Sequence, residues 1–141
     1  MRVQLKNVRV PLFIDVTKPP ACWPLPMEFG PGKVDIIYNA NPIHISSEAA
    51  FSGLLAAAGG LLKPATGILF MYGSSAMDKS ISPQSNIESD QWMKSQNVEW
   101  GLREIADLEK VATANKYYCI LVSLESCAPW AAVDRKTCDA G

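Results

Sequence analysis

The sequence predicts an α/β fold with a sheet of about four mostly parallel strands, and two patterns carry this prediction. Apolar runs at 34–38 and 68–72 are rich in β-branched and aromatic residues and show no alternation with polar ones. Such runs are typical of parallel strands that are covered on both faces. The stretch at 46–62 between them repeats apolar residues at helical spacing. The three segments therefore predict a strand–helix–strand unit with its two strands side by side and parallel.

The elements on either side of the first of these strands follow from local signals. Residues 8–15 favour a strand, and the proline-rich stretch at 16–32 favours a loop. The hydroxyl of Ser46 or Ser47 can cap the helix that follows, and Pro64 stops it.

The second half of the chain predicts fewer, shorter elements. We expect a loop at 75–86 over the carboxyl end of the preceding strand, a short helix at 87–96 and a clearer helix at 102–114. A further strand is predicted at 117–122. Residues 126–141 lack periodicity and predict a disordered tail.

Composition narrows the function classes. The chain has 141 residues, 48% of them hydrophobic and 19% charged, which is ordinary for one globular domain. A net charge of −1 without a basic stripe argues against a nucleic-acid partner. The weakly polar run at 49–62 is too short to span a membrane, and the N-terminal apolar run is too short for a signal peptide. We therefore expect a cytoplasmic or nuclear protein with no membrane partner.

Cysteine and histidine usage argues against a metal site. The four cysteines lie far apart, and His44 is the one histidine that could complete a ligand set. We expect four unrelated thiols and no bound metal. A hydrolase built on Asp35 and His44 is also disfavoured, because no Gly-x-Ser-x-Gly nucleophile turn is present.

Several blocks of sequence resemble the methyltransferase-like protein 26 family. They include Asn-Val-Arg-Val-Pro-Leu-Phe-Ile-Asp-Val-Thr at 7–17, the stretch at 34–46, Ser-Pro-Gln-Ser-Asn at 82–86 and Glu-Trp-Gly-Leu-Arg at 99–103. The resemblance covers residues 7–118. It implies a class I methyltransferase that uses S-adenosylmethionine and an unknown small-molecule or protein acceptor.

The chain also departs from that family at both ends. Family members begin with a further segment that holds a Ser-Gly-x-Gly cofactor loop, and they close with a different last strand. The resemblance therefore implies an incomplete Rossmann-like sheet, with a partial methyltransferase-like domain at 1–125. We expect a truncated form that is inactive as an enzyme. The alternative is a non-enzymatic isoform that acts through protein association at an exposed strand edge.

The resemblance also implies a set of site residues at the carboxyl ends of the strands. Asp15, Val16 and Asn41 would contact the cofactor, with Asp15 close to the adenine. Asn41 and His44 would be catalytic, since a neutral imidazole can act as a base toward a hydroxyl or an amine. The acceptor pocket would be lined by a third group, namely Tyr72, Asn86, Trp100 and Arg103.

Four of these residues also have a purely structural interpretation. Asp15 could cap a turn, and His44 could satisfy carbonyls of its loop. Trp100 could belong to the core. Arg103 could pair with Glu99 or Asp107 at helical spacing.

Overall fold

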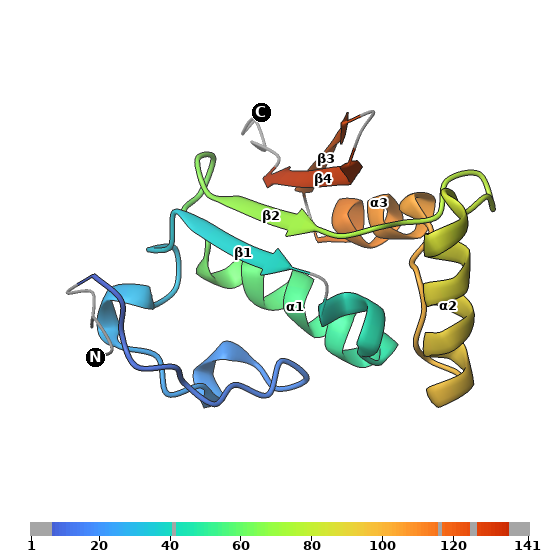
Figure 1. Ribbon diagram of the computed structural model, residues 1–141. Helices are drawn as coiled ribbons and strands as arrows, with labels where there is room; N and C mark the ends of the chain where they lie inside the picture. Colours follow the sequence, from blue (N-terminus) through green and yellow to red (C-terminus); the bar gives the residue numbers. More distant parts are fainter. Residues whose placement is uncertain (1–6, 41, 116, 125–126, 136–141) are drawn as a thin grey trace.

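The computed structural model describes residues 7–40, 42–115, 117–124 and 127–135, and a four-stranded sheet lies at its centre (Figure 1). The strands are β1 (Ile36–Ala40), β2 (Ile68–Tyr72), β3 (Tyr117–Leu124) and β4 (Cys127–Arg135), in the spatial order β1-β2-β4-β3. The α-helices are α1 (Glu48–Leu61), α2 (Gln84–Gln96) and α3 (Ile105–Ala114). Short 3-10 helices lie at η1 (Pro20–Cys22), η2 (Met27–Phe29) and η3 (Pro42–Ile45).

The predicted strand–helix–strand unit is confirmed. β1 and β2 pair in parallel over their full lengths, from Ile36 opposite Ile68 to Ala40 opposite Tyr72. Ser47 caps the intervening helix α1 by accepting a hydrogen bond from the Ala50 backbone N–H at 3.2 Å. This cap satisfies one of the free N–H groups of the first helical turn.

The prediction of a mostly parallel sheet is wrong beyond β2. Strand β4 runs antiparallel both to β2 and to β3, and it occupies Cys127–Arg135, within the range predicted to be a disordered tail. For β3 and β4 the reason is topological. Two consecutive strands with a short connection can only pair antiparallel, whereas a parallel pair needs a long crossover. Residues 136–141 lie outside the described part of the chain.

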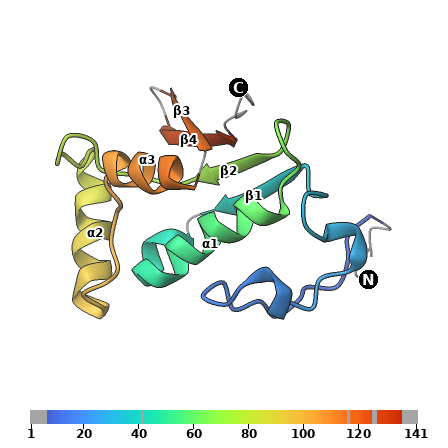
Figure 2. The ribbon, with the colours of Figure 1, turned by 180° about the vertical axis from the view of Figure 1, so that it is seen from behind.

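The core lies between the sheet and two helices on one of its sides. Figures 1 and 2 show α1 and α3 on this side. Leu69 and Met71 of β2 point into it, and the side chains that surround them come from η3, α1, α3 and the residue after α1, namely Ile43, Phe51, Leu55, Ala58, Leu62, Leu108 and Ala112. Alternate residues of β2 therefore anchor both helices to the sheet.

The opposite side of β1 is exposed, contrary to the prediction of a strand that is covered on both faces. Ile36 and Tyr38 are 62% and 60% exposed, and Tyr38 stacks on Phe70 with ring centroids 5.6 Å apart. β1 lies at the edge of the sheet, and no described element covers this part of its surface. A continuous apolar run cannot distinguish a strand buried on both faces from an edge strand with one bare face.

The predicted strand at 8–15 does not form among the described residues. Residues 8–15 run without a paired strand, and Val10 and Phe13 are 73% and 89% exposed. A strand requires a hydrogen-bonded neighbour, and residues 8–15 do not pair with the open edge of β1. Local β-propensity alone was therefore insufficient.

The N-terminal loop folds back on α1 through Trp23, Leu25 and Phe29, whereas Met27 is exposed. The Trp23 indole N–H lies 3.0 Å from the carbonyl oxygens of both Asp15 and Lys18. At Gly53 of α1, a Cβ atom would lie 2.0 Å from the Val16 carbonyl oxygen, so only glycine permits this close approach. The loop and α1 enclose an apolar cavity of about 320 Å³ beneath Trp23, Leu25 and Phe29.

The remaining helices lie at the carboxyl ends of β1 and β2. α2 stands beside the ends of these strands, and α3 returns beneath the sheet (Figure 1). Asn115 ends α3, and its side-chain amide donates to the Val111 carbonyl at 2.9 Å. No helix in the described part of the chain is both long and apolar enough to cross a membrane.

We predict opposite effects for two glycine substitutions in α1. Gly53→Ala would force the Val16 backbone away and lower the free energy of unfolding by about 1–3 kcal/mol. Gly60→Ala has nothing within 4 Å of the new methyl group, and it would raise the free energy of unfolding by about 0.5–1 kcal/mol through helix propensity. Urea unfolding measures both effects. Chymotrypsin cleavage after Phe29, which lines the cavity between this loop and α1, should accelerate only in Gly53→Ala, and equal cleavage rates would contradict the packing of this loop on α1.

Candidate functional site

The candidate site lies where η3, the loop after β2, α2 and the linker between α2 and α3 converge. This is the carboxyl edge of the parallel pair β1 and β2, where open α/β sheets bind their ligands. The Gly101 backbone N–H donates to the His44 carbonyl at 2.9 Å, and this bond fastens the linker to η3. A short helical turn and a linker thus place His44 and Arg103 side by side.

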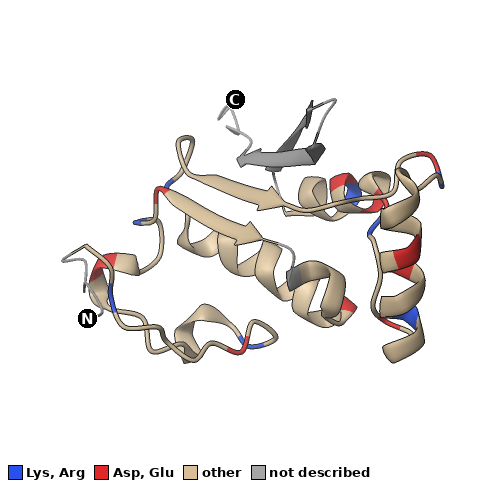
Figure 3. Cartoon of the chain, in the orientation of Figure 1, with Lys and Arg blue, Asp and Glu red and all other residues tan. Residues whose placement is uncertain are grey.

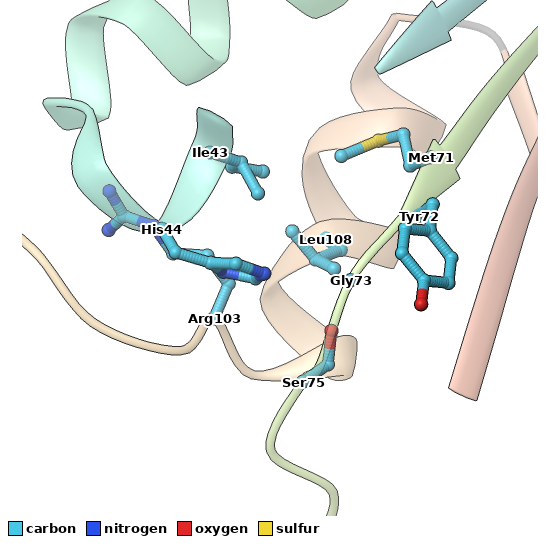
Figure 4. A pocket seen from close by; sticks show the side chains of 8 residues that line it. All are labelled: Ile43, His44, Met71, Tyr72, Gly73, Ser75, Arg103 and Leu108. Atoms are coloured by element: carbon cyan, nitrogen blue, oxygen red, sulfur yellow. The ribbon is translucent and has the colours of Figure 1, made fainter. Parts of the chain in front are cut away.

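His44 is buried, with 7% of its surface exposed, and neither ring nitrogen has a hydrogen-bond partner among the described residues. Figure 4 shows the ring pointing into a space between Gly73, Ser75 and Leu108. This space is a cavity of about 20 Å³, which is enough for one water molecule. His44 also lines a larger pocket on its other side. The structural interpretation, in which His44 satisfies carbonyls of its loop, therefore does not describe its side chain.

Burial lowers the pKa of His44 from its usual 6.5, because the charged imidazolium is costly to desolvate. The Arg103 charge lowers the pKa further, and Asp90 acts in the opposite direction. At neutral pH the ring is therefore uncharged and offers one donor and one acceptor.

Arg103 holds three segments together. Its guanidinium donates to the Ser46 carbonyl at 2.7 Å, to the Glu99 carbonyl at 3.2 Å and to the Glu48 carboxylate at 3.1 Å. The predicted pairing with the side chain of Glu99 or Asp107 is replaced by these bonds. Arg103 lines the small cavity beside His44, and both of its NH₂ groups are occupied (Figure 4).

Asp90 is a site residue that the sequence did not reveal. It is 5% exposed, and its carboxylate accepts from the Leu102 backbone N–H at 2.8 Å and pairs with Lys94 at 2.6 Å. A Cβ on Gly101 would lie 2.7 Å from the same carboxylate, so glycine is needed there, also because its φ is +137°. In the sequence, the feature that could have pointed to Asp90 is its place four positions before Lys94 on a predicted helix, where the two side chains can pair.

Asn86 lies at the start of α2 and lines the larger pocket. Its amide donates to the Ser82 carbonyl at 2.7 Å, and its carbonyl oxygen accepts from the Ser74 hydroxyl at 3.1 Å. The pocket has a volume of about 450 Å³, within the usual size range of small-molecule sites. Its remaining walls come from five elements or loops: Ala40, His44, Ile45, Ser74, Ser89, Met93 and Leu102.

A second cavity lies on the α1 side of η3. It has a volume of about 160 Å³ and is lined by Val16, Asn39 and residues of η3 and α1. The Asn39 side-chain carbonyl oxygen is buried and has no hydrogen-bond partner among the described residues. The sequence did not single out Asn39, because its burial arises from the N-terminal loop that packs across it.

Asp15 lies beside this cavity without lining it. It is exposed, and it accepts hydrogen bonds from the Thr17 hydroxyl at 2.7 Å and the Thr17 backbone N–H at 3.0 Å. These bonds lower the pKa of the Asp15 carboxyl group. This is the turn-capping geometry of the structural interpretation.

The other predicted site residues differ in whether they line the cavities. Tyr72 borders the small cavity on the side of β2, with its ring directed away from His44 (Figure 4). Trp100 is half-buried and lines neither the small cavity nor the two larger ones. Asn41 lies outside the described residues. Figure 3 shows acidic and basic residues interspersed over the described elements.

The fold is that of part of a class I methyltransferase. Human N-acetylserotonin methyltransferase, solved in complex with SAM, matches 87% of this chain with a TM-score of 0.68 at 17% identity. An O-methyltransferase family protein from Burkholderia thailandensis matches 74% with a TM-score of 0.61 at 15% identity, and the SAH-bound CalO1 matches 72% with a TM-score of 0.60 at 17% identity. The matches cover 32%, 31% and 30% of those chains, so this chain spans about a third of their length.

Residues 1–121 match the model of the DUF938 family, described as a protein of unknown function. The chain belongs to this family. The matches to solved structures support the resemblance to methyltransferase-like proteins at the level of the fold.

We predict that protonation of His44 destabilises the fold. The pKa of His44 is lowered in the folded state, so its contribution to stability is complete above the unfolded-state pKa of 6.5 and is lost as pH falls through the folded-state value. The urea midpoint of the native protein should fall between about pH 7 and 5, and His44→Gln should flatten this decline. Asp15→Asn is the control, since the lowered pKa of Asp15 confines its effect to more acidic conditions. An unchanged slope in His44→Gln would contradict the assignment.

Proposed function

We propose that the chain contributes the acceptor side and one edge of the cofactor site to an S-adenosylmethionine-dependent methyl transfer. The observation that carries this proposal is the position of η3, whose buried and unpartnered His44 lines a 450 Å³ pocket beside α2, while the preceding residue, Ile43, lines a 160 Å³ cavity toward α1. Two compartments that share the short segment η3, one of them lined by a neutral base, suit a reaction between two bound molecules. The methyltransferase fold of the solved relatives supports the same class of chemistry.

The residues of the smaller cavity fit the adenine end of this cofactor. A purine with an exocyclic amine has a flat apolar face and a hydrogen-bond donor at one edge. Val16 supplies apolar surface, and the unpartnered Asn39 carbonyl oxygen can accept from such a donor. When bound, the cofactor supplies an electrophilic methyl group on a sulfonium. Asp15, Val16 and Asn41 remain proposed contacts from the family resemblance.

His44 is the proposed general base. As a neutral imidazole it can accept the proton of an acceptor hydroxyl or amine through a water molecule in the small cavity that its ring faces. Arg103 acts as a positioning residue, because it donates to the carbonyl of Ser46, the residue that follows η3. After burial, the Arg103 charge is the second cause of the lowered His44 pKa. Asn86 and Tyr72 are proposed to line the acceptor side, and Trp100 has no contact that supports a role there. Asn41 remains a proposed catalytic residue.

We predict that Asn39→Val weakens binding of S-adenosylhomocysteine to the full chain about 5–10-fold, because the variant loses one hydrogen bond in a buried cavity. Isothermal titration calorimetry measures the affinity. His44→Gln is the matched control and should bind with unchanged affinity, since His44 does not line this cavity. Absence of binding to the native chain would contradict the proposed function.

A second candidate function is association of two copies through β1. The Ile68 backbone N–H donates to the Asp35 carbonyl, and backbone groups alternate in direction along a strand. Those of Ile36 and Tyr38 therefore point to the open edge, while their side chains form a bare apolar surface. An edge of this kind is a template for a further strand.

We predict that Tyr38→Lys abolishes this association by placing a charge on the exposed surface of the edge strand. Sedimentation equilibrium of the native chain should then give a dimer and that of the variant a monomer. Met27→Lys, at a residue that is 85% exposed and distant in sequence from β1, should leave the mass unchanged. A monomeric native chain would contradict the candidate.

A further inference from the structure

The cavity between the N-terminal loop and α1 is lined entirely by apolar residues. Its volume is about 320 Å³, at the lower end of the range of small-molecule sites. α1 contributes Leu54, Ala57, Ala58 and Leu61, and the other walls come from the loop, from β1 and from the residues just before β1. The cavities at η3 and the pocket beside α2 differ from it, because each of them has polar side chains in its lining.

The indole N–H of Trp23 is the one hydrogen-bonding side-chain group among the residues that line this cavity, and it is already used. It donates to the carbonyl oxygens of Asp15 and Lys18, each at 3.0 Å. Because an indole has no acceptor, Trp23 then offers only apolar ring surface to a ligand. A water molecule in a cavity needs two to four polar partners, so this space is unfavourable for water.

The loop that covers the cavity is attached to α1 near its two ends (Figures 1 and 2). At one end the Val16 carbonyl lies so close to Gly53 that an added Cβ would be 2.0 Å from its oxygen. At the other end the Gly32 N–H donates to the Gly60 carbonyl at 3.0 Å. Between these ends, the backbone hydrogen bonds of η1 and η2 stay within the loop. The middle of the loop can therefore lift to admit a ligand while α1 stays folded.

From these contacts we infer that the cavity is a binding site for small uncharged molecules of hydrocarbon character, which carry no hydrogen-bonding group. Such a ligand gains dispersion contacts with the lining, whereas a hydroxyl or a charge would lose its hydration without finding a partner. It has no oxygen or nitrogen to methylate, so this site is separate from the proposed acceptor pocket. Val16 and Leu54 also line the 160 Å³ cavity, so the ligand would lie one side chain away from the proposed adenine contacts.

Trp23 reports on this site without cofactor or turnover. The full ¹⁵N-labelled chain has four tryptophans, and the Trp23→Phe variant identifies the Trp23 indole N–H signal by its loss. Toluene should shift this signal in a saturable way, with a dissociation constant of about 1 mM or below. The signal of Trp92, which is 61% exposed and does not line the cavity, should stay in place. Phenol and benzoate match the ring of toluene but carry a group that the cavity cannot pair, and each should bind at least about 10-fold more weakly.

A pair of variants on α1 locates the binding. Ala57→Phe places a ring inside the cavity and should abolish the toluene shift. Ala56→Phe makes the same change at the neighbouring exposed position, which does not line the cavity, and should retain the shift. The inference is overturned if toluene leaves the Trp23 signal unmoved, if phenol and benzoate bind as tightly as toluene, or if folded Ala57→Phe binds toluene like Ala56→Phe. The comparison of the three compounds uses the native chain, so it decides the question even if Ala57→Phe does not fold.

Discussion

The geometry of the site depends on how the linker between α2 and α3 is fastened to the segment that follows β1. The linker contains no regular element, so side-chain and backbone hydrogen bonds must hold it. Arg103 binds carbonyls on both sides of the junction, Asp90 accepts from the Leu102 N–H, and the Gly101 N–H reaches the His44 carbonyl. Buried polar groups of this kind are costly when one partner is missing, so the set acts as a unit.

This fastening explains why His44 can remain without a partner of its own. The backbone of η3 is held at His44 and Ser46 by groups from the linker, so the imidazole is not needed to position its own turn. A buried ring whose nitrogens make no hydrogen bond is unfavourable for folding, and such groups are commonly tolerated where a ligand uses them. The fold therefore keeps the side chain available at some cost in stability.

Local sequence patterns predicted the parts of the fold whose formation is local. The β2 strand, the Ser47 cap and the end of α3 at Asn115 all follow from neighbouring residues. Strand β4 was missed because Cys127–Arg135 contains Pro129 and several alanines, which have low strand propensity. Its formation depends on pairing with β2 and β3. Asp90 and Asn39 were missed for a related reason, since segments distant in sequence bury them. Asn86 was identified because it lies in a block of the family resemblance, and His44 because a neutral imidazole beside a helix start can act as a base.

The position of β2 has a consequence for motion at the site. β2 is paired along its whole length with β1 on one side and β4 on the other, and Leu69 is fully buried, so local opening of this strand requires loss of most of the sheet. The loop that follows β2 is joined to the linker mainly through the backbone of Ala76, which bonds to Arg103 and Ile105. Met71 and Tyr72 of β2 line the small cavity beside His44, so one wall of this cavity belongs to a unit that opens only with the sheet, while the loop after β2 can separate from the linker by breaking a few hydrogen bonds. Entry to the small cavity can thus proceed by a subglobal fluctuation that leaves the sheet intact.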